Sequence, residues 1–304
     1  MAGTVVTLVA PRAGGLSDSM VADATARLHR LAGGSVALDV LAEGQALDLL
    51  LPQTLPQPAL LQAIRNEFQN LNLPVDVFAQ AADAGRRKKL LVADMDATIV
   101  VGETLDELAA HLGIEDKVAP ITARAMRGEL DFAAALAERV AMLKGMPFEV
   151  IDKVRSALAL SPGAEVLVRT MAAHGARCVL ASGGFDVFTG AVAVRCGFHA
   201  HFGNRLEIDS AMRATGQVLP PLVDKDRKRA IVLEEARRLA IAPHDAITVG
   251  DGANDIPMLQ AAGIGVAYHA KPAVCAATGF QVRHGDLTAL LYLQGYKSRE
   301  FARI

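Results

Sequence analysis

The stretch "LLVADMDATIV", residues 90–100, decides the fold, because an apolar run ends there in two acids that are one residue apart. Residues 90–93 are typical of a strand that is buried on both faces in the middle of a parallel sheet. Asp94 and Asp96 follow, and Thr98 lies two positions further on. Carboxylates at the end of a buried strand need a partner, so this segment predicts a functional site at a sheet edge.

The composition indicates a globular chain with a small-molecule substrate. The 304 residues, of which 52% are hydrophobic, allow roughly two domains with a core each. The formal net charge of -2 gives no basic field that favours nucleic acid or an anionic membrane.

The apolar run within residues 1–15 is too short for a membrane span and has no basic segment before it. Cys178, Cys196 and Cys275 form no CxxC pair and indicate inert thiols. We expect a cytoplasmic protein without nucleic-acid or membrane partners.

Downstream of residue 85, strands and helices alternate. The segments "RCVLASGG" (177–184) and "AITVGDGAND" (246–255) each predict a strand that runs into a glycine turn before a helix, and "IGVAYHA" (264–270) predicts a further strand. This order predicts an α/β fold with a doubly wound parallel sheet, in which ligands bind beyond the carboxyl ends of the strands. Three polar clusters occupy such ends: Asp94 with Asp96, Ser182 with Gly183 and Gly184, and Asp251 with Asn254 and Asp255.

These clusters favour phosphate chemistry that depends on magnesium. Carboxylates from two strands repel one another unless a hard cation lies between them, and Mg²⁺ prefers carboxylate oxygens, water and substrate phosphate. The "ASGG" turn offers N–H groups and a hydroxyl to an anion, and Lys228 offers a positive charge. No Ser-His-Asp or Cys-His constellation is evident, so the nucleophile is either a carboxylate or a metal-bound water.

Four segments resemble, in order, the motifs of the haloacid dehalogenase (HAD) superfamily. They are "DMDAT" (94–98), "LASGG" (180–184), Lys228 and "VGDGAND" (249–255). From about Lys89 to the C-terminus, segments such as "GETLDELAAHLG" (102–113) and "FGNRLE" (202–207) are similar to the phosphoserine phosphatase family within that superfamily. The resemblance implies a Rossmann-like HAD sheet with a small helical cap inserted after the first motif, at roughly residues 103–160.

The resemblance also implies a role for each matching residue. Asp94 is expected to be the nucleophile and Asp96 the general acid and base. Mg²⁺ is expected to bind Asp94, the backbone carbonyl of Asp96, and Asp251, with Asp255 outside the direct ligands. The residues implied to bind substrate are Glu103, Arg139, Ser182, Gly183, Lys228, Asn254, Thr98, Met126 and Phe132. Of these, Glu103 is expected to bind the ammonium of O-phosphoserine and Arg139 its carboxylate, a pairing that suits the guanidinium fork.

The expected activity is hydrolysis of O-phospho-L-serine to L-serine and phosphate through a phospho-aspartyl intermediate, the last step of serine biosynthesis. Ala97 stands where the family usually has Ser, and one lost hydroxyl is worth about 0.5–1.5 kcal/mol. A HAD phosphatase or phosphotransferase acting on another small phosphomonoester is therefore the alternative. A non-catalytic binding protein is a third reading, which the intact acids of the first and fourth motifs disfavour.

Residues 1–84 predict a separate α+β domain with the element order βαββαβ, that is, a small antiparallel sheet with both helices on one face. This order resembles the ACT domain, which implies an amino-acid effector; a ferredoxin-like domain used only for dimer contacts is the alternative, and a homodimer fits both. The basic residues 86–89 predict a solvated linker or the entry to the strand at 90–93, and we expect the boundary between this domain and a phosphatase domain at 85–304 here. Residues 293–304 resemble a polar, basic tail.

Overall fold

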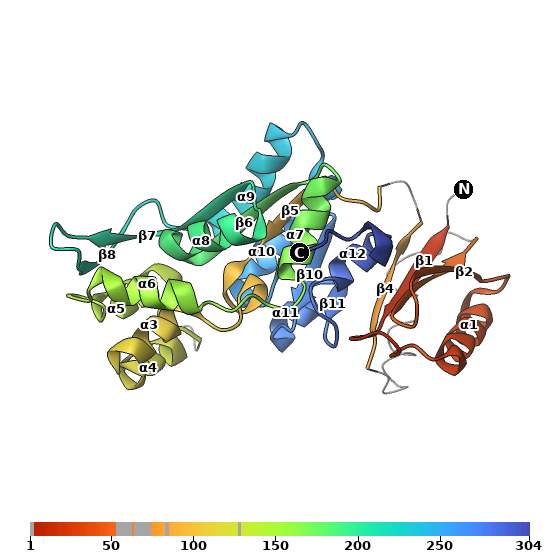
Figure 1. Cartoon of the computed structure of the whole chain (residues 1–304), viewed down its shortest axis with the longest axis horizontal. Helices are drawn as coiled ribbons and strands as arrows, with labels where there is room; N and C mark the ends of the chain where they lie inside the picture. The colour runs from red at the N-terminus through yellow and green to blue at the C-terminus, as the bar shows by residue number, and fades with distance from the viewer. Residues whose placement is uncertain (1–2, 53–62, 64–73, 83–84, 127–128) are drawn as a thin grey trace.

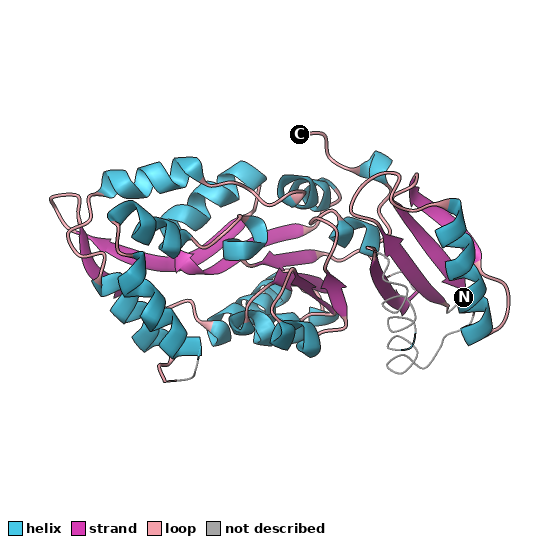
Figure 2. Cartoon of the chain, turned by 90° about the horizontal axis from the view of Figure 1, so that it is seen from below, coloured by secondary structure: helices cyan, strands magenta, loops and turns pink. Residues whose placement is uncertain are grey.

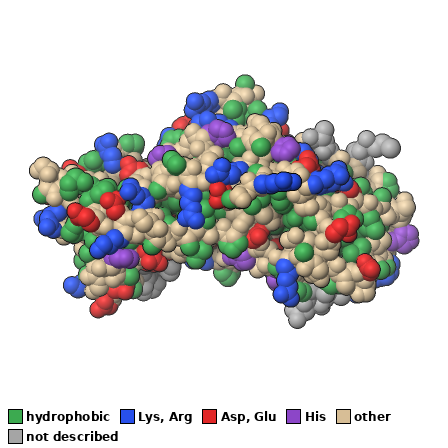
Figure 3. Space-filling model, viewed as in Figure 1, with side chains coloured by type: hydrophobic (Ala, Val, Ile, Leu, Met, Phe, Trp, Pro, Cys, Tyr) green, Lys and Arg blue, Asp and Glu red, His purple; other side chains and the backbone are tan. Residues whose placement is uncertain are grey.

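The computed structural model describes residues 3–52, 63, 74–82, 85–126 and 129–304. Within these residues the strands form a four-stranded sheet near the N-terminus and a seven-stranded sheet in the rest of the chain (Figure 1). The described part contains no helix that is long and apolar enough to cross a membrane. On the face shown in Figure 3, basic and acidic side chains are interspersed over the surface.

The larger sheet confirms the predicted α/β fold. Its strand order is β11-β10-β9-β5-β6-β7-β8. The strands are β5 (Leu90–Ala93), β6 (Arg177–Phe185), β7 (Ala200–Ile208), β8 (Ala214–Leu219), β9 (Ala246–Gly250), β10 (Ile264–Tyr268) and β11 (Phe280–Val282). All neighbouring pairs are parallel except β7 and β8, which add an antiparallel edge that the alternation of strands and helices did not predict.

Helices cover both faces of this sheet (Figure 2). One core joins Leu91 and Ala93 to residues of α7 (Ala164–Ala173), α8 (Asp186–Cys196) and α12 (Ala289–Leu293). A second core joins Leu90 and Val92 to residues of α9 (Lys225–Arg238), α10 (Ile256–Ala261) and α11 (Pro272–Ala277). Successive side chains of β5 therefore enter opposite cores, which explains why the whole strand is apolar.

A helical cap lies between the first strand of this sheet and α7. Its helices are α3 (Thr104–Leu112), α4 (Glu115–Met126), α5 (Phe132–Ala141) and α6 (Phe148–Ala157). Asp131 begins α5 by accepting a hydrogen bond from the N–H of Ala134, and Gly113 ends α3 in the left-handed conformation. The cap contacts the β7–β8 hairpin through a bridge between Pro147 and Arg213. This insertion matches the predicted cap.

The N-terminal sheet has the order β2-β3-β1-β4 and is antiparallel throughout. It consists of β1 (Thr4–Val9), β2 (Ala37–Ala42), β3 (Ala46–Leu51) and β4 (Asp76–Ala81), and α1 (Asp18–Ala32) packs on one face. The predicted second helix, residues 59–72, lies outside the described residues apart from position 63. The described elements follow the predicted order at β1, α1, β2, β3 and β4. The second helix, the likeness to an ACT domain and the boundary at residue 84 stay predictions.

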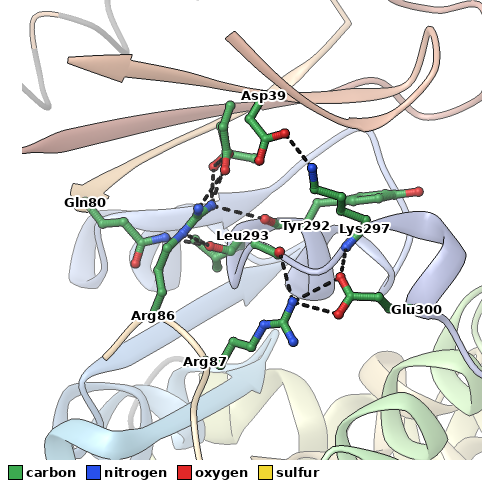
Figure 4. A network of polar contacts seen from close by, with 11 residues as sticks. Asp39, Gln80, Arg86, Arg87, Tyr292, Leu293, Lys297 and Glu300 are labelled. Carbon is green, nitrogen blue, oxygen red and sulfur yellow. Dashed lines mark hydrogen bonds and ion pairs between the residues drawn. The ribbon is translucent and has the colours of Figure 1, made fainter. Parts of the chain in front are cut away.

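The other face of the N-terminal sheet packs on the C-terminal part of the chain. Val9 and Phe78 belong to the same apolar core as Tyr292, Leu293 and Tyr296. The expected polar tail at 293–304 is therefore wrong for its first residues, because Leu293 is fully buried and Tyr296 is 1% exposed. Around Tyr296, Lys297 pairs with Asp39 of β2 and Glu300 pairs with Arg87 (Figure 4).

Of the two alternatives for residues 86–89, the solvated linker is wrong for two residues, whereas the entry to a strand is confirmed, because β5 begins at Leu90. Lys88 is buried, and only 15% of the Arg86 side chain is exposed. Arg86 donates two hydrogen bonds, of 2.6 and 3.0 Å, to the Asp48 carboxylate of β3. It also donates to the backbone carbonyls of Tyr292 and Leu293 at the end of α12 (Figure 4). The Arg86 guanidinium can be buried here because its N–H groups donate to the Asp48 carboxylate and to these carbonyls.

Candidate active site

The three predicted polar clusters lie at adjacent strand ends. β5 is flanked by β9 and β6, and the strand order reverses at this point, since the chain continues to β7 on one side and to β10 on the other. Open α/β sheets bind ligands at such a reversal, beyond the carboxyl ends of the strands. The structure thus brings Asp94, Ser182 and Asp251 to one edge of the sheet.

Asp94 belongs to a buried cluster of three carboxylates. Carboxylate oxygens of Asp94, Asp251 and Asp255 lie within 4.8 Å of one another. The Lys228 Nζ, from α9, lies 2.7 Å from both Asp94 Oδ1 and Asp255 Oδ1. Thr98 points its hydroxyl at Asp251, 3.5 Å away. The carboxylates outnumber the ammonium, and oxygen donors at this spacing fit a hard divalent cation.

The charges in this cluster depend on one another. Burial lowers the pKa of Lys228, but the carboxylates of Asp255 and Asp94 outweigh burial and raise it above the ordinary value, so Lys228 stays protonated. Burial and the neighbouring Asp255 raise the pKa of Asp94, and Lys228 opposes them. A cation among the carboxylates would favour their ionised forms and thereby make Asp94 nucleophilic.

Asp96 points away from this cluster. Its Oδ1 accepts a hydrogen bond of 2.8 Å from the N–H of Thr104, where α3 begins, and its Oδ2 accepts one of 3.1 Å from the Ser182 hydroxyl. Ser182 in turn accepts a hydrogen bond from the N–H of Gly184. Burial raises the pKa of Asp96, although the bonds from Thr104 and Ser182 oppose it. A raised pKa suits a group that must hold a proton before it donates it.

Small residues let these side chains approach the backbone. A Cβ at Gly184 would lie 2.6 Å from Asp96 Oδ2, and one at Gly250 would lie 2.5 Å from the Cγ of Asp255. Ala97 has a φ of 51°, an uncommon conformation for a residue with a side chain. Its N–H donates to the carbonyl of Gly102, which closes the turn after Asp96. The glycines therefore leave room for the carboxylates of Asp96 and Asp255.

A cavity of about 600 Å³ joins the strand ends to the cap. Asp94, Asp96 and Asn254 line it from the sheet, and Phe132 and Arg139 line it from α5. The Phe132 ring reaches the glycine turn after β6, since its Cζ lies 3.4 Å from where a Cβ of Gly183 would be. The cap and the sheet thus enclose one space that contains both acids of the first motif.

The cap brings opposite charges to this cavity. Although Glu103 is exposed at the cavity mouth, limited hydration of its carboxylate raises the pKa to about 7, with further contributions from Asp96 and Asp251. Burial lowers the pKa of Arg139, while the carboxylates of Asp106 and Glu103 oppose this. A ligand that carries both an ammonium and a carboxylate finds a partner for each here.

One predicted substrate-binding residue cannot be placed, and three residues near the cavity were not predicted from the sequence. The Met126 side chain lies outside the described residues. Lys225 and Lys271 also line the cavity. Asn204, fully buried in β7, donates to the carbonyl of Gly183 and accepts from the N–H of Val223. Asn204 lies within the segment "FGNRLE", but only the fold shows that it supports the glycine turn.

Residues 91–260 match the family model of haloacid dehalogenase-like hydrolases, which spans all four motifs and more than half of the chain. The chain belongs to this HAD-like hydrolase family. A phosphoserine phosphatase of Archaeoglobus fulgidus is 42% identical over 208 residues, which are 68% of this chain and 60% of that relative. The matches to the first three curated relatives cover between 52% and 60% of those proteins' length.

Solved structures of HAD-like hydrolases resemble this one over different lengths. A probable phosphoserine phosphatase from Vibrio cholerae is 31% identical with a TM-score of 0.76, and the match covers 96% of this chain and 86% of that one. A phospho-aspartyl intermediate analogue of a phosphoserine phosphatase is 34% identical with a TM-score of 0.63, and the match covers 67% of this chain and 98% of that one. The likeness to the Vibrio cholerae protein extends over the N-terminal sheet as well.

Proposed function

We propose that this HAD-like hydrolase is a phosphoserine phosphatase, which hydrolyses O-phospho-L-serine to L-serine and phosphate. One observation carries the proposal: the cavity that contains Asp94 and Asp96 also contains Glu103 and Arg139. Phosphoserine has a phosphate for the first pair, an ammonium for Glu103 and a carboxylate for Arg139. A sugar phosphate has neither of the last two groups. Relatives of this name at 42% identity support the proposal.

The two acids of the first motif divide the reaction between them. An oxygen of Asp94 attacks phosphorus, so that an acyl phosphate bond forms while the bond to the serine oxygen breaks. Asp96 gives its proton to that departing oxygen. Asp96, now ionised, then takes a proton from a water that attacks phosphorus, and phosphate leaves as the Asp94 carboxylate is restored. The raised pKa of Asp96 fits its first task, and its ionised form fits the second.

Positive charge and hydrogen-bond donors stabilise the transferring phosphoryl group. Lys228 is held between Asp94 and Asp255, so its ammonium needs no reorganisation when charge develops on the phosphoryl oxygens. Ser182, the N–H of Gly183 and Asn254 lie around the same cavity, and Thr98 lies beside Asp251. Phe132 from the cap packs on the glycine turn after β6, where it limits the access of water to the phosphoryl group.

We infer that the cation is Mg²⁺, held by Asp94, the backbone carbonyl of Asp96 and Asp251. The carboxylate oxygens spaced within 4.8 Å support this inference. When bound, Mg²⁺ neutralises phosphate charge and keeps the carboxylates ionised. The pairing of Asp255 with Lys228 supports a role beside the direct ligands, although its carboxylate belongs to the same cluster.

We also place the enzyme in the cytoplasm. Cys178 and Cys196 are free and buried, which fits a reducing compartment. Burial raises the pKa of Cys178 to about 12 and that of Cys196 to about 11, so both thiols are inert. The amino-acid effector and the homodimer stay predictions.

Phosphate release from L-phosphoserine, with and without Mg²⁺, tests the reaction. We expect release that requires the metal and is lost in Asp94→Asn, because an amide is a poor nucleophile. Metal-dependent release from another small phosphomonoester but none from phosphoserine would favour the alternative phosphatase or phosphotransferase. Full turnover by Asp94→Asn would contradict Asp94 as the nucleophile.

Arg139→Ala tests the substrate. A charged hydrogen bond is worth about 1.5–3 kcal/mol, so we expect KM for phosphoserine to rise roughly tenfold to a hundredfold, whereas KM for p-nitrophenyl phosphate stays the same. Arg124→Ala is the matched control, because Arg124 is a cap arginine that pairs with Glu138 at 2.9 Å. Equal changes for both substrates in Arg139→Ala would remove Arg139 from the carboxylate role.

A further inference from the structure

A buried acid of the N-terminal sheet holds a turn of the catalytic part. Asp76 begins β4 and is 3% exposed. Its Oδ1 accepts hydrogen bonds from the N–H groups of Arg283 and His284, at 2.7 and 3.1 Å, and its Oδ2 accepts one of 2.8 Å from Gly285. Three successive N–H groups on one carboxylate fix the position of the 283–285 turn. This turn follows β11, the edge strand of the larger sheet.

The same turn holds His269. The His269 Nε2 lies 2.9 Å from the carbonyl oxygen of Gly285, and the His269 N–H donates to the carbonyl of Val282. His269 has a φ of 43°, a left-handed conformation that is uncommon outside glycine and that persists where surrounding contacts impose it. Two contacts to residues 282–285 impose it here. His269 follows β10 directly, so it sets the direction in which the chain leaves this strand.

Two residues after His269 the chain reaches the catalytic cavity. The N–H of Lys271 donates to the carbonyl of Asp251, and its side chain lines the cavity together with Glu103. Lys271 and Glu103 line the same cavity, and the ammonium of Lys271 lowers the pKa of Glu103. The carboxylates at this edge would repel a phosphate dianion, and Lys271 adds positive charge from the loop after β10, whereas Arg139 adds it from the cap.

We propose that Asp76 and His269 are positioning residues, which hold the loop 269–271 so that Lys271 meets the anionic substrate at the mouth of the cavity. The N-terminal sheet thereby contributes to substrate binding, through the path Asp76, Gly285, His269 and Lys271. The inference rests on the proposed phosphatase function for its kinetic readout. It requires no movement of the N-terminal sheet and no effector, because the path consists of contacts within one conformation.

Steady-state kinetics on the full chain with Mg²⁺ test the path through non-additivity. Lys271→Ala removes an exposed charge, so we expect KM for phosphoserine to rise about threefold to fivefold with kcat nearly unchanged. Asp76→Asn, which keeps the shape of the side chain but turns one acceptor into a donor, should raise KM by a similar factor. The double variant should match Lys271→Ala, because Asp76 acts through Lys271. Multiplied effects in the double variant would overturn the proposal.

A control in the same interface separates positioning from general loosening. Gln80 lies on β4 like Asp76, but its amide donates to the carbonyl of Leu293, at 2.6 Å, and does not contact the 283–285 turn. Gln80→Ala should leave KM unchanged, and a rise equal to that of Asp76→Asn would overturn the proposal. His269→Asn is a second variant that tolerates the left-handed conformation but shortens the reach to Gly285. His269→Asn should raise KM for phosphoserine by the factor expected for Asp76→Asn. It therefore tests the same path even if Asp76→Asn folds poorly.

Hydrogen exchange gives a readout that does not depend on the reaction. In Asp76→Asn, the amides of His269 and Lys271 should exchange faster than in the unmodified protein, whereas Gln80→Ala should leave them unchanged. Unaltered exchange in Asp76→Asn would refute the positioning role. If the unmodified protein fails to hydrolyse phosphoserine, the proposed function fails, yet exchange at these two amides still decides whether Asp76 holds the loop.

Discussion

Arg86→Met tests whether the ion pair between the N-terminal sheet and the rest of the chain is shielded from water. Asp48 is 3% exposed and Arg86 is 15% exposed. Without Arg86, the Asp48 carboxylate keeps a hydrogen bond of 2.6 Å from the Thr7 hydroxyl but loses its counter-ion. Removal of one partner from a buried pair costs about 3–5 kcal/mol. We expect a loss of roughly 3 kcal/mol in the free energy of unfolding, because Thr7 and partial exposure of Arg86 favour the lower end of that range.

Urea unfolding followed by tyrosine fluorescence measures this loss. The chain has no tryptophan and three tyrosines, of which Tyr292 and Tyr296 lie at this interface. Lys297→Met is the matched control, since it also removes one positive charge from the interface. The pair of Lys297 with Asp39 is 2.5 Å long, but its side chains are 31% and 42% exposed. Exposed pairs contribute about 0–1 kcal/mol, so the control should unfold almost like the unmodified protein.

A loss below about 1 kcal/mol in Arg86→Met, equal to that in the control, would refute the reasoning, since it would mean that water reaches Asp48. The double variant Arg86→Met, Asp48→Leu sharpens the test. Apolar residues often replace a buried ion pair without loss of stability, so the double variant should be more stable than Arg86→Met alone. A double variant less stable than the single one would show that the pair itself, and not the stranded carboxylate, dominates.

Two further predictions concern the catalytic cavity. Gly184→Ala places a Cβ 2.6 Å from Asp96 Oδ2, so the carboxylate must leave the Ser182 hydroxyl. A displacement of this size should lower kcat on the order of a hundredfold, which steady-state kinetics would reveal, and an unchanged kcat would contradict the placement of Asp96. The pKa of about 7 for Glu103, raised mainly by limited hydration, means that the carboxylate loses its charge as pH falls below that value. KM for phosphoserine should therefore rise on the acid side of pH 7, and Glu103→Gln should remove this pH dependence.

Patterns of a few residues were enough to predict the main sheet and the edge at which the site lies. The apolar run before Asp94 could only be a strand covered on both faces, and glycines mark the turns after β6 and β9. Parallel strands with helical crossovers bring their carboxyl ends to one edge, so the clusters had to converge. The sequence pattern was sufficient at this edge, because each polar motif directly follows the strand at whose end it lies.

Contacts between side chains at that edge could not be predicted in the same way. The sequence places Asp96 and Asp94 two residues apart, yet Asp96 points to Thr104 and Ser182 while Asp94 points to Lys228. The backbone is irregular at this point, with non-helical dihedral angles at Asp96 and a left-handed φ at Ala97 that no spacing rule predicts for alanine. Lys271 was missed for a related reason, because an exposed lysine before a proline gives no sign that it faces a cavity.

The basic residues before β5 show why a run of charged residues does not always indicate a solvated linker. A guanidinium can be buried only where acceptors surround it, and three independent elements supply them to Arg86. Asp48 and the Thr7 hydroxyl come from the N-terminal sheet, and the carbonyls of Tyr292 and Leu293 come from the last turn of α12. Helix ends leave such carbonyls without partners inside the helix, and the arginine fork suits several acceptors at once. Partners that lie 38 and 206 residues away from Arg86 leave no mark on the local sequence, so burial of this charge could be recognised only from the fold.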